Sequence, residues 1–242
     1  MRNILKLFAA GLCGVCAAGF PAAAVADEAG LAPPCAVVEL FTSQGCYSCP
    51  PAEKVLAENF AVLPEVLALE FHVDYWDDLV YGGSVWADPF SNRKYTERQT
   101  GYNVKLRNTR GVYTPQAIIQ GGQQAGGTQK DRISSAVRES LAQTPSVRFR
   151  FNGRKVRAEG ALPPGVQMFY AVYWRKRETE VAAGENKGKL LHNTNVVTTL
   201  KRLPFGAREA ELPEIDSAVQ GCAVWMQQGR SGKIISAAKC PA

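Results

Sequence analysis

The most constraining feature of the sequence is a pair of cysteines, Cys46 and Cys49, between a predicted strand and a predicted helix. Residues 36–41 (AVVELF) form an apolar, β-branched run that is typical of a strand buried in a parallel sheet. Residues 52–60 space their apolar side chains as a helix does. The order strand, Cys-x-x-Cys, helix therefore predicts an α/β layer with the cysteines where the strand ends and the helix begins.

The same alternation continues to residue 143. Residues 66–76 and 112–122 read as two further buried strands. Residues 88–107 read as a helix, because Asp88 followed by Pro89 resembles an N-cap and its first helical residue. Residues 128–143 carry apolar side chains at helical spacing. Three strands alternating with three helices predict a central sheet flanked by helices.

The pattern changes at Pro145. Beyond it, alternating or β-branched runs are separated by turn residues, without a helical segment of useful length. We therefore expect an α/β domain over residues 27–144 and a β-rich, sandwich-like second domain over residues 145–242.

The first residues resemble an export signal. A basic start, an apolar run and a small-x-small site at Ala24–Ala26 predict a signal peptide over residues 1–26. The mature chain would be periplasmic or secreted, without stable membrane insertion after signal removal. Its net charge would be +4, from 26 basic and 22 acidic residues, because Arg2 and Lys6 leave with the signal. These charges are scattered, which argues against nucleic acid as a partner. The oligomeric state is not readable.

Export places the remaining cysteines in an oxidising compartment, where disulfides persist. Cys222 and Cys240 flank a predicted hairpin whose turn lies at residues 229–232, so they face each other across two strands. We predict a structural disulfide between them, with Cys35 as the competing partner of either. Otherwise Cys35, at the far end of the first strand from Cys46, is unpaired or pairs between chains.

The Cys46–Cys49 pair has three chemical interpretations. In thiol–disulfide exchange, a helix N-terminus stabilises the attacking thiolate and no resident cofactor is needed. In a metal site, Cu(I) would bind the two thiolates and His72, whereas structural zinc usually needs a second cysteine pair. In the third, the disulfide is inert. Pro50 and Pro51 lack N–H donors, so the regular helix is expected to start at Pro50, with the cysteines in the loop above it.

A distant stretch carries a family resemblance. Thr114–Pro115 leads into residues 116–119 and then two glycines, which resembles the cis-proline loop of the thioredoxin superfamily. The resemblance implies a thioredoxin-like fold and a cis bond, with this loop facing the cysteines and holding an extended substrate strand. It also implies that Glu39 relays protons to Cys49. The alternative is a plain turn that opens an edge strand.

Longer motifs resemble a narrower group. VVELFTSQGCYSCPPAE, FHVDYWD, VYTPQ and GENKGKLLHNTNVV are similar to an exported bacterial family known as domain of unknown function 1223. That family supplies no substrate. Compared with ordinary thioredoxins, residues 74–107 contain an aromatic-rich insertion at the strand ends that line a ligand crevice. Tyr47 and Trp76 are therefore expected to contact substrate beside Thr114 and Pro115, unless the insertion's aromatic residues only pack it onto the domain.

The leading hypothesis is a thiol–disulfide oxidoreductase, or a redox-active accessory protein, that acts on protein or peptide thiols and disulfides. Cys46 would attack and Cys49 would resolve the mixed disulfide. The alternative is a non-enzymatic binding protein, either for Cu(I) or for a protein partner.

Overall fold

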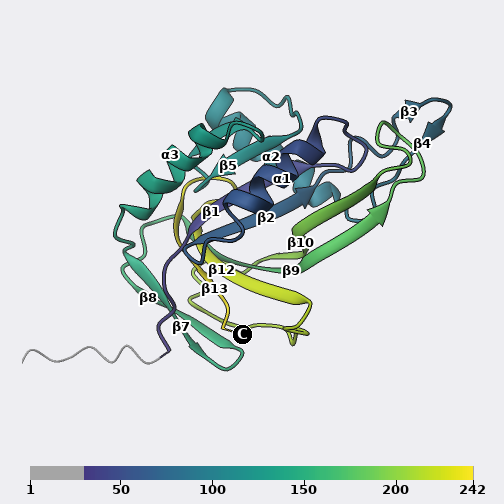
Figure 1. Cartoon of the computed structure of the whole chain (residues 1–242). Helices are drawn as coiled ribbons and strands as arrows, with labels where there is room; N and C mark the ends of the chain where they lie inside the picture. The colour runs from purple at the N-terminus through teal and green to yellow at the C-terminus, as the bar shows by residue number, and fades with distance from the viewer. Residues whose placement is uncertain (1–29, 242) are drawn as a thin grey trace, which may run out of the picture.

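The computed structural model describes residues 30–241, so the predicted signal peptide lies outside the described residues. The chain is a mixed α/β fold built on one large sheet (Figure 1). The elements of the first part are β1 (Ala36–Thr42), α1 (Cys49–Asn59), β2 (Val66–His72), β3 (Val80–Tyr81), β4 (Ser84–Val85), α2 (Arg93–Arg107), β5 (Gln116–Ile119), β6 (Gln123–Gly126) and α3 (Lys130–Leu141). The later elements are β7 (Val147–Asn152), β8 (Lys155–Gly160), β9 (Val166–Glu180), β10 (Leu190–Arg202), β11 (Glu209–Glu211), β12 (Gln220–Gln228) and β13 (Ile234–Lys239).

The large sheet has eight strands in the order β13-β12-β9-β10-β2-β1-β5-β6. Strands β1 and β2 are parallel, and β10 lies parallel to β2 where Val196 pairs with Glu70. On the other side of β1, β5 is antiparallel to β1 and β6 is antiparallel to β5. The sheet therefore runs without interruption from the α/β part into the β-rich part. The division at residues 144 and 145 stays a prediction about which parts fold alone.

Alternation along the strands gives the sheet two different faces. On one face, Val37 and Phe41 of β1 pack with Tyr95 and Tyr102 of α2 and with Trp225 of β12. The opposite face has two coverings. Helices α1 and α3 cover it at β1, β2 and β5, through an apolar core of their own. Beyond β10, the small antiparallel sheet β11-β8-β7 covers it instead. The β-rich part thus packs a small antiparallel sheet against strands of the large one, and its separation as a sandwich-like domain stays a prediction.

Two predicted elements differ from the structure. Helix α2 begins at Arg93 rather than near Asp88, because the side chain of Asn92 caps it by accepting from the Lys94 N–H at 3.0 Å. Asp88 instead turns its carboxylate toward the cysteine loop. The predicted strand 112–122 is shorter and is followed by β6, because positive φ angles at Gln120 and Gly121 reverse the chain. Within residues 30–241, none of the helices is both long and apolar enough to cross a membrane.

Candidate functional site

Cys46 and Cys49 form a disulfide at the start of α1, with Cα atoms 5.4 Å apart. The helix begins at Cys49, one residue earlier than the prolines suggested, and Ser48 is its N-cap residue. Cys46 lies in the preceding loop, and the Cys49 N–H donates to the Cys46 carbonyl oxygen at 3.1 Å. The two prolines therefore follow the disulfide without displacing Cys49 from the helix.

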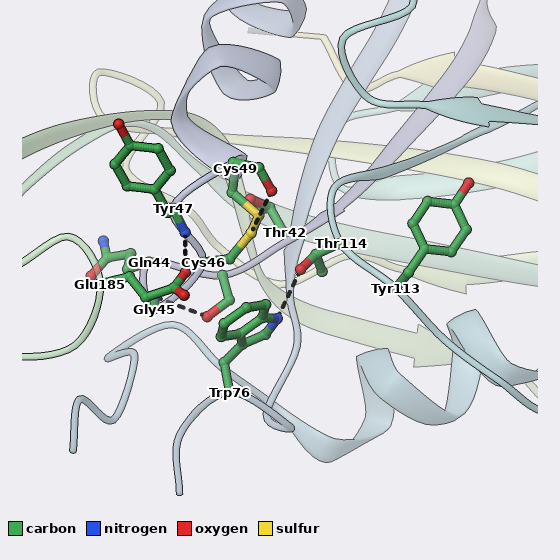
Figure 2. Close-up of a disulfide and its surroundings, with 12 residues drawn as sticks. Thr42, Gln44, Gly45, Cys46, Tyr47, Cys49, Trp76, Tyr113, Thr114 and Glu185 are labelled. Atoms are coloured by element: carbon green, nitrogen blue, oxygen red, sulfur yellow. Dashed lines mark hydrogen bonds between the residues drawn. A yellow bond between two sulfur atoms is a disulfide. The ribbon is translucent and has the colours of Figure 1, made fainter. Parts of the chain in front are cut away.

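The disulfide is buried. Both cysteines have 0% exposed surface, whereas Tyr47 between them is 65% exposed. Trp76, from the insertion, covers one side, and its Nε1–H donates to Thr114 Oγ1 at 2.8 Å (Figure 2). Gly45 allows this close packing, because a Cβ atom there would lie 3.3 Å from Trp76 Cβ. Trp76 thus joins the cysteine loop to the Thr114 loop instead of lying open to solvent.

The connection between β9 and β10 covers the disulfide from another side. The fully buried Asn186 donates from Nδ2 to the carbonyl oxygens of Gln44 and Cys46, both at 2.9 Å. Glu185 accepts the Tyr47 N–H at 2.8 Å, as Figure 2 shows. Lys189 Nζ lies 4.3 Å from the centroid of the Tyr47 ring. We call residues 184–189 the roof segment, because they hold the backbone of the cysteine loop.

The Thr114–Pro115 bond is cis, in agreement with the sequence expectation. This loop lies close to the first turn of α1. A Cβ atom at Gly127 would be 2.9 Å from Pro115 Cβ and 2.8 Å from Ala52 Cβ, so Gly127 separates the two by little more than its backbone. The structure thus brings Cys46, Cys49, Thr114 and Trp76 together.

Glu39 lies on the other face of the sheet, away from α1. Its carboxylate accepts from Arg98 Nε at 2.6 Å and from Arg98 Nη2 at 2.9 Å, and Tyr102 OH donates to it at 2.6 Å. Burial lowers the pKa of Arg98, but Glu39 more than offsets this and holds the pKa above its usual value. Glu39 is therefore an ion-paired residue of the α2 core, and the expected proton relay from it to Cys49 would have to cross the sheet.

A different set of acids lies on the α1 side. Glu53 of α1, Glu70 and His72 of β2, and Asp88 of the insertion are all buried, and we call them the acidic cluster. His72 Nδ1 lies 2.7 Å from Asp88 Oδ2, and His72 Nε2 lies 3.5 Å from Glu70 Oε2. Thr42 Oγ1 donates to Glu53 Oε1 at 2.5 Å.

The acidic cluster is tied to the cysteine loop and to β10. Asp88 Oδ2 accepts the N–H of Gln44, two residues before Cys46, at 2.8 Å. Glu70 accepts from Asn193 Nδ2 at 3.0 Å and from the Thr194 N–H at 3.1 Å. The acidic cluster and the roof segment therefore both bind the backbone of the cysteine loop at Gln44.

Burial and mutual charge shift the pKa of every member. Burial, followed by the charge of Glu70, raises the pKa of Glu53 to about 8. Burial also raises the pKa of Glu70. For His72, burial lowers the pKa, but Asp88 and Glu70 outweigh it and raise the pKa to about 10. For Asp88, burial raises the pKa, but the His72 charge outweighs it and the pKa falls below its usual value.

With the Cys46–Cys49 disulfide closed, the described residues do not present a metal site of the expected kind, and the Cu(I) alternative stays a prediction about the reduced protein. Among residues 30–241, no group of three or more His, Cys, Asp and Glu side chains is arranged to hold a metal ion. The two sulfur atoms are bonded to each other, and His72 is engaged with Asp88. The structure thus does not assemble Cys46, Cys49 and His72 as a set of ligands.

The other cysteines follow the sequence prediction. Cys222 and Cys240 form a disulfide across β12 and the residue after β13, with Cα atoms 5.3 Å apart. Cys35 is the free cysteine of the described residues and is buried. Burial raises the pKa of its thiol to about 12, so the thiolate is disfavoured.

Sequence reasoning missed Glu53, Glu70, Asp88 and Asn186. Two of them left a signal. Glu53 follows Cys49 by four residues in a helix, which places both on one face. Glu70 and His72 are two apart in an otherwise apolar strand, so they share a face as well. Asp88 left none, because long-range packing places it, and Asn186 was marked only by its place in the family-like stretch GENKGKLLHNTNVV.

The fold and the site define a mixed α/β protein with a covered Cys-x-x-Cys disulfide at the start of a helix. The chain belongs to the family described as "Protein of unknown function (DUF1223)", whose model matches residues 37–227. It is similar to an Agrobacterium tumefaciens protein of known crystal structure, at 30% identity and a TM-score of 0.62, over 84% of this chain and 92% of that one. Its fold is also similar to that of HBP35 of Porphyromonas gingivalis, at 13% identity and a TM-score of 0.55, over 86% of this chain and 74% of that one. No curated protein matches the chain.

Proposed function

We propose that this protein is an exported thiol–disulfide oxidoreductase with a thioredoxin-like core. The observation that carries the proposal is the Cys46–Cys49 disulfide at the start of α1, with the Thr114–Pro115 loop beside that helix. Cys46 precedes the helix and would be attacked first. Cys49, within the helix, would leave as the second thiol.

The strand order supports a thioredoxin-like core. Strands β2-β1-β5-β6 form a four-stranded unit in which β1, β2 and β6 run in one direction and β5 is antiparallel to them. Helices α1 and α3 cover one face and α2 the other. This arrangement resembles that superfamily, and it places the cysteines at the carboxyl end of β1, where open α/β sheets bind ligands.

Burial of the disulfide limits the access of a partner thiolate to its sulfur atoms. A thiolate must approach a disulfide sulfur directly, but Cys46 has no exposed surface. The exchange partner would therefore displace Trp76 or the roof segment. Tyr47 is exposed and lies beside the roof segment, so it would meet the partner first. The two disulfides are compatible with an oxidising compartment, which supports export to the periplasm or beyond.

The proposal is tested with Cys46→Ser and Cys49→Ser in the mature chain. Wild type is expected to exchange disulfides with reduced and oxidised peptide substrates, and Cys46→Ser to lose this activity. Cys49→Ser is expected to accumulate mixed disulfides through Cys46, because the second thiol is missing. Adducts are measured by mass spectrometry after acid quenching.

Cys35→Ser is the matched control, because Cys35 is buried and lies at the opposite end of β1. It should retain the wild-type exchange rate. If wild type shows no exchange and Cys49→Ser traps no adduct, the disulfide is inert. The fold would then act as a scaffold for a partner protein.

A further inference from the structure

We propose that Glu53 supplies the proton to the Cys49 sulfur when the disulfide opens, and takes it back when the disulfide forms. This inference rests on the proposed function, and it assigns the proton transfer to the helix rather than to β1. The observation behind it is the position of Glu53 in the acidic cluster, one helical turn beyond Cys49.

The geometry of α1 places Glu53 beside Cys49. Residues four apart in a helix lie on one face, with Cβ atoms about 5–6 Å apart. Cys49 and Glu53 belong to the same buried stripe of α1, with 0% and 3% exposed surface. A thiolate on Cys49 would therefore form away from water, where an uncompensated charge is costly. The proton that neutralises it has to come from a neighbouring group.

Charge counting indicates that the acidic cluster holds such a proton. Three carboxyl groups surround one imidazole, so full ionisation would leave two uncompensated negative charges in a buried space. Asp88 and His72 form the ion pair, since their atoms lie 2.7 Å apart. Glu53 and Glu70 have only this same imidazole as a cation among the described residues that act on them, and Asp88 lies closer to it than Glu70 does. Burial and the charge of Glu70 accordingly raise the pKa of Glu53 to about 8.

The charged and polar groups around Glu53 come from three elements. Thr42 of β1 donates a hydroxyl hydrogen bond to it, Glu70 and His72 face it from β2, and Asp88 faces it from the insertion. Glu70 and Asp88 raise the pKa of Glu53, whereas His72 and Thr42 lower it. Strand β10 contributes the neutral amide of Asn193, which is bonded to Glu70.

A thiolate of a partner dithiol attacks Cys46 Sγ, and the Cys46–Cys49 bond breaks with its electron pair on Cys49 Sγ. The Glu53 carboxylic acid transfers its proton to that sulfur and becomes a carboxylate. The second partner thiolate then attacks the partner sulfur of the mixed disulfide, and Cys46 leaves as a thiolate. The partner is oxidised to its disulfide, and Cys46 and Cys49 are reduced.

The test uses dithiothreitol as the partner dithiol and measures the rate of opening of Cys46–Cys49 between pH 6 and 10. Rates are followed by alkylation and mass spectrometry and are expressed per concentration of dithiothreitol thiolate. For wild type this rate should fall as pH rises through about 8, because Glu53 loses its proton. Proton transfer by a positioned acid contributes about 10²–10⁴-fold. Glu53→Gln should therefore be about 100-fold slower at pH 7 and lack the step near pH 8.

Two further variants keep the test decisive. Glu70→Gln should move the step to lower pH, because the charge of Glu70 raises the pKa of Glu53, and a purely structural role would not move it. Glu53→Asp should restore a step, which also covers the case in which Glu53→Gln fails to fold. Glu58→Gln is the control on the exposed face of α1 and should match wild type, since the Glu58 side chain is 62% exposed.

The inference is overturned if Glu53→Gln keeps the wild-type rate and profile, or if Glu70→Gln leaves the step in place. Failure of the proposed function gives a different result. In that case dithiothreitol still opens the disulfide with the Glu53-dependent profile, but peptide dithiols and disulfides are not exchanged.

Discussion

Glu39 and the three carboxyl groups of the acidic cluster are buried on opposite faces of strands β1 and β2, and the number of cations beside them differs. On the α2 face, Glu39 meets Arg98, whose guanidinium donates two hydrogen bonds to it. On the α1 face, the three carboxyl groups of the acidic cluster share only His72 as a cation among the residues around Glu53. Glu39 is thus matched by one guanidinium, whereas three carboxyl groups of the acidic cluster share one imidazole.

The surroundings of Arg98 strengthen this contrast. Its guanidinium carbon lies between 5.0 and 5.8 Å from the ring centroids of four aromatic side chains, and Gln227 accepts another of its hydrogen bonds. A charge held this way by hydrogen bonds and aromatic faces stays charged. Glu39 therefore belongs to a structural ion pair, whereas the acidic cluster contains Glu53, whose pKa is raised to about 8 by burial and by the charge of Glu70.

The largest expected effect breaks the fixed pair. Arg98→Met should lower the free energy of unfolding by about 3–5 kcal/mol, because it leaves Glu39 charged and buried without a partner. The measurement is urea unfolding at pH 7, followed by fluorescence. Adding Glu39→Gln to Arg98→Met should recover part of the loss, since both charges are then removed. If the double variant is no more stable than Arg98→Met, the ion pair is not the cause.

A smaller effect is expected from removing the cation of the acidic cluster. His72→Gln should lower the free energy of unfolding by about 2–3 kcal/mol, somewhat less than is usual for breaking a buried ion pair. Asp88 would still accept the N–H groups of Gln44 and Phe90, at 2.8 and 2.9 Å. Urea unfolding of His72→Gln and wild type checks this. If His72→Gln loses as much as Arg98→Met, the acidic cluster depends on its cation as strongly as the Arg98–Glu39 ion pair does.

The smallest effect is a change of slope with pH. A carboxyl group whose pKa is raised on folding stabilises the folded state below its unfolded pKa, and this stability is lost as pH rises through the folded pKa. Because of Glu53, the free energy of unfolding therefore falls as pH rises from about 4.5 to 8. His72, with its pKa raised to about 10 from 6.5, acts in the same direction only above about pH 6.5.

Urea unfolding measured between pH 5 and 6.5 therefore separates the effect of Glu53 and Glu70 from that of His72. The free energy of unfolding of wild type should fall as pH rises over this window. In Glu53→Gln this fall should be smaller by about 1–2 kcal/mol, on the scale of about 1.36 kcal/mol for one pKa unit. Glu58→Gln should keep the wild-type slope. An unchanged slope in Glu53→Gln would place the proton of the cluster on Glu70 instead.

Local patterns predicted the parts of this protein that depend on neighbouring residues. The buried strand before Cys46, the helix after Cys49 and the hairpin that pairs Cys222 with Cys240 all follow from periodicity and spacing. The acidic cluster did not, because Asp88 looks in sequence like a helix cap. Only the fold reveals that Asn92 caps the helix and that Asp88 turns to His72 and Gln44. Asn186 was missed for the same reason, as it contacts residues about 140 positions away.

The parallel pairing of β10 with β2 has a consequence for the whole chain. Without β10, strand β2 would be the outer edge of its sheet, with unpaired backbone groups of the kind that attract other chains. The same strand carries Asn193 and Thr194 against Glu70, and the segment just before it carries Asn186 against Cys46. The β-rich half therefore has three roles in the structure. It pairs with the edge of β2, it contributes hydrogen bonds to Glu70 of the acidic cluster, and its roof segment covers the disulfide. The surroundings of the Cys46–Cys49 disulfide are thus completed by the half of the chain that contains neither of these cysteines.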